Sequence, residues 1–269
     1  MICIICSIYF FCLLSIVKSV HFLGGTITWH PLNQSAVGTP VAIVITQTYH
    51  WTYPRILCTD AMVAANQPVS LGIYTSFATQ TLDCIANCGN GSLGYIPPSI
   101  VPRCTNISIP SNITYSQRSD IVFLQAGNDF SVAFRSFGWR PLVTAISADW
   151  CVSMRIVVAT RIDNGLYNNA PVATLVSPIN IPVNISTVIN VPVMDVDGDF
   201  TRCRWSTNVT VNECGEVCPP DSLPSNTTIY PNCTIIITGH KIDDWYALTI
   251  MVSQPLFYLI LIIFCVLKK

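Results

Sequence analysis

Charged side chains are scarce in this sequence. They make up 10% of its 269 residues, whereas an ordinary soluble domain carries about 25%. The 13 lysines and arginines nearly balance the 14 aspartates and glutamates, and no basic run occurs. This balance argues against a nucleic-acid partner. A chain of this length needs another source of surface polarity, and attached sugar is one.

Sequence signatures of catalysis are also missing. The nucleophile motif Gly-x-Ser-x-Gly does not occur, and Gly91-Ser92-Leu93-Gly94 is not a nucleophile elbow. The four histidines lie in no known catalytic motif. A secreted hydrolase would need a clustered acid pair or a triad, so this class is the least favoured and we expect no enzyme. Outside the N-terminal apolar stretch, which contains Cys3-Ile-Ile-Cys6, no Cys-x-x-Cys pair is present, and this argues against structural zinc.

Acceptor motifs for N-linked sugar, in contrast, are frequent. Each Asn-x-Ser/Thr triplet is an acceptor only when the chain enters the secretory pathway. Eight such triplets in a chain with so little charge predict a glycoprotein. Their asparagines are Asn33, Asn90, Asn106, Asn112, Asn184, Asn208, Asn226 and Asn232.

Cysteines point to the same compartment. Of 13 in total, four lie in the terminal apolar stretches, at Cys3, Cys6, Cys12 and Cys265. The nine between them fit an oxidising compartment and a disulfide framework. Eight form two similar sets of four, which are Cys58, Cys84, Cys88 and Cys104, then Cys203, Cys214, Cys218 and Cys233.

Each set of four cysteines allows three pairings, and the sequence does not choose among them. The inner two cysteines of each set are four residues apart, so the sets form a weak internal echo. Cys151 belongs to neither set. We therefore predict that it is a free thiol or forms an intermolecular bridge.

Apolar stretches mark both ends of the chain. Residues 1–19 resemble a signal peptide ending at Val17-Lys18-Ser19, although the basic n-region is missing and a retained anchor is the alternative. At the other end, 13 apolar residues, 255–267, precede Lys268-Lys269. As a helix they would span roughly 20 Å, short of the ~30 Å hydrocarbon core.

We therefore expect the transmembrane anchor to begin near Met251, with residues 251–267 in the membrane and 268–269 as a cytoplasmic tail. This use competes with a closing strand at Ala247–Val252. A lipid-anchor signal is disfavoured, because no polar spacer precedes the tail and two lysines end it.

The region between these ends has the pattern of β-strands. Val41–Tyr49 is β-branched and aromatic. The clearest strand, Trp150–Thr160, has an apolar face and a more polar face that begins at Cys151. No amphipathic helix of 12 residues is apparent. The sequence predicts an all-β fold of two disulfide-bonded β-sandwich domains followed by a C-terminal hydrophobic helix.

The predicted domain boundary lies within Arg161–Asn169, a joint rich in asparagine and aspartate. Residues 20–165 form the N-terminal β-rich domain and residues 166–250 the second. In the second, residues 185–193 alternate as in a strand. Pro192 cannot donate to a ladder, so this is an edge strand or a bulge. Tyr246–Val252 is the last strand.

The second domain carries the motif Asn169-Ala-Pro-Val172, an alternating run, Asp195-Val-Asp-Gly-Asp199 and Trp205. In this order it resembles the immunoglobulin-like modules of the polycystic-kidney-disease and cadherin-like type. The resemblance covers roughly residues 168–250 and implies a sandwich fold and an extracellular location, but no activity. Cys203 departs from the pattern. The whole chain also looks like a group of animal extracellular proteins.

The same resemblance makes calcium the candidate ion. Asp195, Asp197 and Asp199 form a cluster of hard oxygens, and calcium needs six to eight such ligands. In cadherins a linker resembling residues 163–169 supplies further ligands, so Asp163 is the fourth candidate. The alternative is a turn in which Asp and Asn bond their own backbone around Gly198. Apart from this ion, no cofactor is expected.

Tryptophans offer one further candidate site. Trp139-Arg140 and Trp150 suit a sugar-binding surface, but a tryptophan on an alternating strand is more often part of the core. We predict a glycosylated cell-surface ectodomain in the secretory pathway, at the plasma membrane or outside the cell. Its role is adhesion or binding of an extracellular protein or glycan, and the alternative is a structural spacer.

Overall fold

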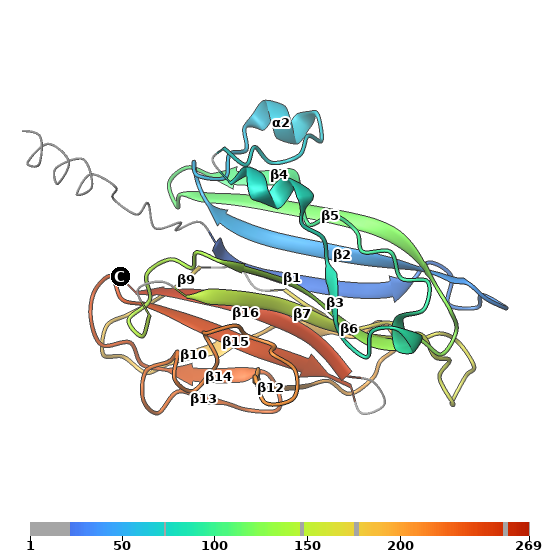
Figure 1. Cartoon of the computed structure of the whole chain (residues 1–269). Helices are drawn as coiled ribbons and strands as arrows, with labels where there is room; N and C mark the ends of the chain where they lie inside the picture. The colour runs from blue at the N-terminus through green and yellow to red at the C-terminus, as the bar shows by residue number, and fades with distance from the viewer. Residues whose placement is uncertain (1–21, 73, 146–147, 175–177, 255–257, 269) are drawn as a thin grey trace, which may run out of the picture.

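Figure 1 shows the computed structural model of the chain, which describes residues 22–72, 74–145, 148–174, 178–254 and 258–268. The predicted signal peptide, with Cys3, Cys6 and Cys12, lies outside the described residues. Strands dominate the described part of the chain, which confirms the predicted β-rich class.

The N-terminal half has two groups of strands. The first group is ordered β1-β2-β5-β4 and the second β3-β6-β7. Short helices occupy the loops between Cys58 and Cys104. The bounds are β1 Phe22–Pro31, β2 Val41–Thr52, α2 Asp60–Ala64, η1 Thr75–Thr79, β3 Asp83–Ala86, η2 Asn90–Ser92, β4 Arg103–Ser108, β5 Ile113–Leu124, β6 Asp129–Phe137 and β7 Asp149–Val157.

The C-terminal half consists of shorter strands and one long hairpin. β10, β14 and β13 make a small sheet, β8 pairs β11, and β12 pairs β15. The bounds are β8 Val172–Ala173, β9 Ile179–Ile181, β10 Thr187–Asn190, β11 Val193–Met194, β12 Arg202–Trp205, β13 Thr228–Ile229, β14 Thr234–Ile237, β15 Trp245–Ser253 and β16 Tyr258–Lys268. The alternation over 185–193 breaks at Pro192, between β10 and β11, because proline has no ladder donor.

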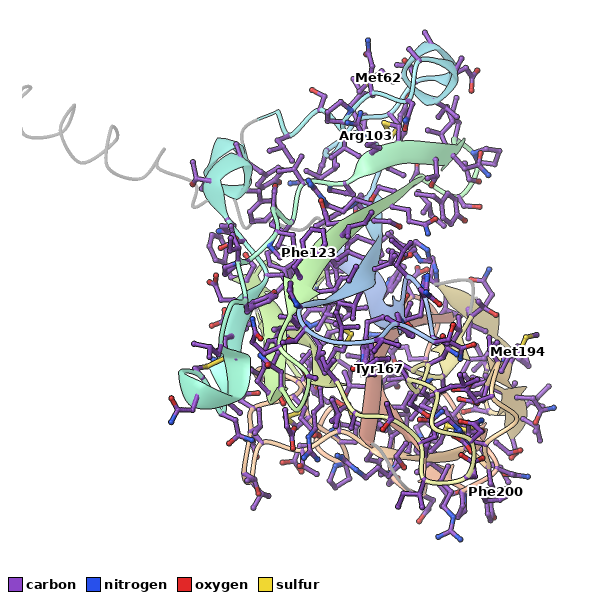
Figure 2. All side chains as sticks on the ribbon, turned by 90° about the vertical axis from the view of Figure 1, so that its right-hand side faces the viewer. Met62, Arg103, Phe123, Tyr167, Met194 and Phe200 are labelled. Carbon is purple, nitrogen blue, oxygen red and sulfur yellow. A yellow bond between two sulfur atoms is a disulfide. The ribbon has the colours of Figure 1, made fainter. Side chains whose placement is uncertain are left out.

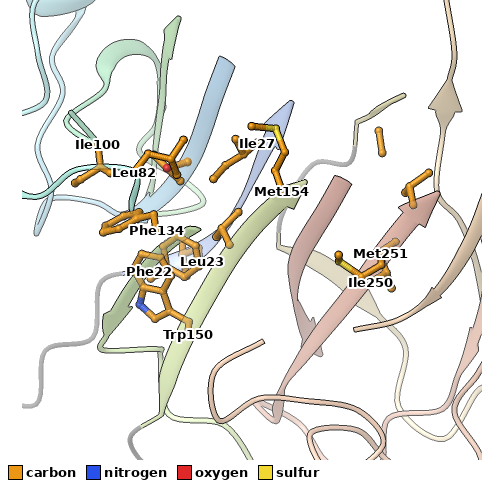
Figure 3. Close-up of a cluster of buried hydrophobic side chains, with 14 of the residues drawn as sticks. Phe22, Leu23, Ile27, Leu82, Ile100, Phe134, Trp150, Met154, Ile250 and Met251 are labelled. Atoms are coloured by element: carbon orange, nitrogen blue, oxygen red, sulfur yellow. The ribbon is translucent and has the colours of Figure 1, made fainter. Parts of the chain in front are cut away.

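Aromatic rings fill the space between the two N-terminal groups of strands. Phe22 stacks on Trp150 with ring centroids 3.7 Å apart, and Phe134 meets Trp150 edge-on at 4.6 Å. Figure 3 shows these three side chains gathered with Leu23. Such ring pairs stabilise the folded state beyond what burial of their apolar surface alone contributes. Trp139 and Trp150 are both 1% exposed, so they belong to the core and are not an exposed sugar platform.

Both faces of β7 are covered. Trp150 faces the aromatic core, while Cys151 and Ser153, on the face predicted to be more polar, are also buried. Residues of the C-terminal half cover this second face, since the Cys151 thiol lies 3.2 Å from the carbonyl of Asn212. β7 is therefore an internal strand of the whole molecule.

The predicted membrane helix at 251–267 is wrong for the described residues. Met251–Ser253 ends β15, and the described residues that follow form β16, which pairs antiparallel with β15 from Tyr258 to Leu267. The run is rich in β-branched and aromatic residues, which suit a strand, and pairing on both edges satisfies its backbone. No helix among the described residues is long and apolar enough to cross a membrane.

β16 also joins the two halves of the chain. One edge carries β15, and the other meets β7 at Met154, β1 at Gly24–Thr26 and, in parallel, β9 at Ile179–Ile181. The resulting 11-stranded sheet crosses the predicted boundary at residue 165. One hydrophobic cluster likewise includes buried residues from both halves. The described halves therefore share a sheet and a core, although each has its own disulfides.

Candidate functional site

The eight candidate cysteines form four disulfides with the same nesting in each half. The outer bridges are Cys58–Cys104 and Cys203–Cys233, and the inner bridges are Cys84–Cys88 and Cys214–Cys218. Of the three pairings open to each set, both halves take the one that joins the inner cysteines to each other. The two sets of four cysteines are thus alike in disulfide connectivity as well as in spacing.

Cys151 is a free cysteine and is fully buried. Its thiol donates to the carbonyl oxygen of Asn212. Burial raises its pKa from the ordinary 9.0 to about 11. An intermolecular bridge, which was one predicted alternative, would require this strand face to open, because another chain cannot reach a sulfur with no exposed surface.

All eight sequon asparagines lie on the surface of the molecule. Three of them, Asn112, Asn184 and Asn226, have positive φ and so lie at tight turns. In two others the side-chain oxygen accepts a hydrogen bond from the backbone amide two residues further on. Asn33 accepts from Ser35, and Asn232 accepts from Thr234. Each asparagine is therefore open to attachment of a sugar.

The joint contains a nearly buried arginine that the predicted calcium site did not include. Arg161 follows β7, and its side chain is 5% exposed. Its guanidinium donates to both carboxylate oxygens of Asp163, at 3.1 and 2.9 Å, and to both of Asp199. It also lies 3.8 Å from Asp197 and donates to Asn168 at 3.1 Å. Such bidentate pairs are the strong form of ion pair.

Asp197 is held by the N-terminal half and by the linker. One oxygen accepts from the side-chain amides of Gln34 and Asn169, at 2.8 and 2.9 Å. The other accepts from the Asn169 backbone amide at 2.7 Å. Gln34 lies in the loop after β1, and its carbonyl accepts from the amide of Tyr167. Asp197 thus fastens the loop after β1 to the joint.

Asp195 closes the turn and reaches the end of β15. One oxygen accepts from the backbone amides of Asp197 and Asp199, at 2.9 and 3.1 Å, and the other from Gln254. Burial raises the pKa of Asp195, while the Arg161 guanidinium lowers that of Asp163. The alternative prediction, a turn in which aspartate bonds its own backbone, describes Asp195 well.

The residues of the joint do not fit a calcium ion while Arg161 is in place. Asp195, Asp197 and Asp199 are brought together, with one oxygen of each within 4.8 Å of the others. However, both oxygens of Asp163 and Asp199 accept from Arg161, and those of Asp195 and Asp197 accept from amides. A calcium ion needs six to eight oxygens with free lone pairs pointing at it. Here a guanidinium supplies the positive charge.

The sequence pattern missed Arg161, Gln34 and Gln254 as parts of this cluster. Arg161 stands two residues before Asp163, and an arginine beside several aspartates is a signal that could have found it. Gln34 and Gln254 lie 163 and 59 residues from their aspartate partners. Only the tertiary fold brings them in.

A second candidate site is the outward face of β1, β2 and β5. Along β5 the side chains of Gln117, Ser119, Ile121 and Phe123 point outward. Ile121 lies opposite Val44, and Phe123 opposite Ala42, in β2. Ile121 is 53% exposed and Phe123 60%, so two large apolar side chains are in contact with solvent. The outward-facing strand residues of this face include histidines but no aspartate, glutamate, lysine or arginine. Figure 2 labels Phe123 on β5, far from Phe200.

These features define a disulfide-bonded β-protein whose halves are held by a shared strand and an arginine-centred joint. No protein-family model and no curated protein matches the chain. Two of the solved structures that match the chain contain immunoglobulin domains. "Tandem Ig repeats of Dlar" is 14% identical, with a TM-score of 0.27 over 92% of this chain and 98% of that chain. The N-terminal four Ig domains of Dscam1 isoform 6.44 are 11% identical, with a TM-score of 0.23 over 91% and 70%. At these TM-scores neither likeness carries weight for fold or function.

Proposed function

We propose that this chain is a glycosylated extracellular domain that binds a ligand or mediates adhesion. The observation that carries the proposal is the exposure of all eight sequon asparagines on a chain with only 10% charged residues. Sugar at these positions would supply the missing surface polarity. Four disulfides support an oxidising compartment, because such bonds persist there and not in the cytosol.

Binding is favoured over a passive spacer by the outward face of β5. Exposed apolar side chains that lie together mark interaction sites more often than isolated ones do. Ile121 and Phe123 are such a pair, and the neighbouring strand adds Val44 beside them. A spacer has no need for an uncharged face with an exposed phenylalanine. We propose this face as the contact surface for an extracellular protein or glycan.

The rival class, a secreted hydrolase, finds no support in the thiol of Cys151. A catalytic thiol needs exposure and a lowered pKa. Cys151 has no exposed surface, and burial raises its pKa to about 11. The proposal is therefore a non-enzymatic one.

We also propose that the joint works without a metal. Arg161 neutralises part of the charge of Asp163, Asp197 and Asp199, and its side chain is buried among them. This arrangement would keep the two halves in one orientation at any calcium concentration.

The test of the binding role compares two phenylalanines of similar exposure. Phe123 on β5 is 60% exposed and Phe137 on β6 is 55% exposed. The full chain, made in animal cells with a tag, is applied to animal cells, and retained protein is measured across a concentration series. We expect saturable retention that Phe123→Asp lowers and Phe137→Asp leaves unchanged. Absence of saturable retention, or equal effects of both substitutions, would favour the spacer.

A further inference from the structure

Strand β5 is paired along only part of one edge. On one side β2 pairs it over its whole length, from Ile113 to Leu124. On the other side β4 pairs it from Ile113 to Gln117 and no further. No other strand in the described part of the chain pairs with β5. Residues 118–124 therefore form an open edge, which can be followed in Figure 1 where β5 runs past β4.

The backbone groups on this open edge belong to Ser119, Ile121 and Phe123. The carbonyl of Ala42 accepts from the Leu32 amide on the β1 side, so Ala42 and its partner Phe123 form a pair without mutual hydrogen bonds. Phe123 therefore turns its amide and carbonyl away from β2, as do the alternate residues Ile121 and Ser119. No hydrogen bond from another described segment reaches these groups.

The shape that fits such an edge is another extended chain. Unpaired amides and carbonyls in strand geometry are a template for a further strand. Ile121 and Phe123 add exposed apolar side chains, so a segment paired here would also remove apolar surface from water. A Cβ on Gly94 would lie 3.7 Å from the carbonyl oxygen of Phe123, so the loop that contains Gly94 limits the segment at that end.

A notch of about 540 Å³ lies at the other end, where the open edge meets the start of β4. Arg118, Asp120 and Arg103 are the charged residues that line it. Arg118 donates to both oxygens of Asp120 at 2.6 Å and to the carbonyl of Val101 at 2.8 Å, so the charges of Arg118 and Asp120 cancel. Arg103 donates to the neutral carbonyl of Asn66 at 2.6 Å, and no described carboxylate pairs with it. The notch therefore carries an uncompensated positive charge.

The direction of β4 decides which end of a bound segment meets Arg103. β4 runs antiparallel to β5 and begins at Arg103, opposite Gln117. A segment that pairs antiparallel with residues 118–124 lies on the same line ahead of β4, so its carboxyl terminus comes to Arg103. A terminal carboxylate matches a guanidinium both in charge and in hydrogen-bond geometry.

We propose that the open edge and the notch bind the free carboxyl terminus of an extended segment of another protein. The last residue of the segment lies opposite Ser119, and the alternate residues before it, which are apolar, lie opposite Ile121 and Phe123. The terminal carboxylate accepts from Arg103. This inference rests on the proposed binding role of the β5 face, and it names a protein terminus as the partner in place of a glycan.

The probe is the peptide Thr-Val-Thr-Val-Thr-Val with a fluorescent label at its amino end and a free carboxyl terminus. The full glycosylated chain is titrated into it, and binding is followed by fluorescence anisotropy. We expect saturable binding that amidation of the terminus weakens about tenfold, as for loss of a hydrogen bond to a charged group. Arg103→Gln should weaken the free-acid peptide by the same factor and leave the amidated peptide unchanged. Arg202→Gln is the matched control, since Arg202 is exposed and lies outside the notch, and it should change neither.

Two N-methylated peptides test the strand pairing without altering the protein. A methyl group on the amide of the valine opposite Ile121 removes the donor to the Ile121 carbonyl and should weaken binding at least about tenfold. A methyl group on the amide of the threonine just before that valine points away from β5, because successive amides of a strand alternate in direction. This second peptide should bind as the unmethylated one does.

Lack of saturable binding by a folded, glycosylated chain would overturn the inference, and so would equal affinity for the free-acid and amidated peptides. Equal loss with both N-methylated peptides would show that the peptide does not bind as a strand. A stable dimer that Ile121→Asp dissociates would assign the edge to a second copy of this chain instead. Each of these results leaves the proposed function standing while cells retain the chain through Phe123, whereas absence of saturable retention by cells would refute the proposed function itself.

Discussion

Arg161 and Asp199, 38 residues apart, form a two-pronged ion pair at the joint between the halves. Their side chains are only 5% and 15% exposed, so water screens the pair poorly. The turn that carries Asp199 is thereby fixed against the segment that leaves β7. Pairs of this kind cost most when one partner is removed, because the other is left buried and charged.

The first prediction follows from that asymmetry. Arg161→Met keeps most of the apolar stem and removes the charge, which leaves Asp197 and Asp199 without a cation. We expect the free energy of unfolding to fall by about 3–5 kcal/mol, measured by urea denaturation. Adding Asp199→Asn should recover part of the loss, since it removes one of the stranded charges. A loss below about 1 kcal/mol in Arg161→Met would contradict the role given to this arginine.

Calcium provides the second prediction. In the wild-type chain, melting temperatures in 1 mM calcium and in chelator should agree within about 1 °C, because the guanidinium of Arg161 already engages the carboxylates. In Arg161→Met the freed oxygens should gain a weak calcium dependence. With a dissociation constant near 10⁻⁴ M, 1 mM calcium would add roughly 1.4 kcal/mol and raise the melting temperature by a few degrees. A clear shift in the wild type would restore the calcium site implied by the cadherin-like resemblance.

The third prediction concerns pH and Cys151. Burial raises the thiol pKa from 9.0 to about 11, so the folded state holds its proton to higher pH than the unfolded state does. The contribution to stability is complete below pH 9 and is lost as the pH rises to about 11. Relative to Cys151→Ser, the wild type should lose up to roughly 2–3 kcal/mol across this window, measured by denaturation at each pH.

At pH 7 the same serine variant should fold nearly as well as the wild type, because its hydroxyl can also donate to the carbonyl of Asn212. Iodoacetamide should label Cys151 only after unfolding. Rapid labelling of the native chain, or the recovery of Cys151 in a disulfide, would contradict its place between the halves.

The fourth prediction separates a shared strand from a membrane anchor. A chain that ends at Gln254 lacks β16, and so exposes the edges of β1 and β15 that β16 pairs. We expect this truncated chain to be retained in the cell and degraded. If residues 251–267 were an anchor instead, the truncation would release a folded protein into the medium. The medium and the cell lysate are compared by blotting.

Strands with strict alternation could be predicted from the sequence, since β2 and β7 each show an apolar face with period two. The hydrophobic run at 258–267 could not, because an unbroken apolar segment has no period and suits a helix or a buried strand equally. Its strand partners are β1, near the N-terminus, and β15, near the C-terminus. Only the tertiary fold brings β1 beside this run.

The candidate sites show the same division. The eight cysteines and the sequons could be found by their spacing, whereas the choice among three pairings depended on which strands meet. The aspartates around Gly198 were found by their motif. The prediction of calcium overlooked Arg161, because the direction of its side chain is set by how the chain packs after β7.

The most direct test of the proposed extracellular role is peptide mapping of the full chain made in animal cells. After glycosidase treatment in heavy-oxygen water, each asparagine that carried sugar gains a mass label. We predict the label at most of the eight sequons, together with the four nested disulfides and an unbonded Cys151. A chain with unlabelled sequons and reduced cysteines would contradict the account.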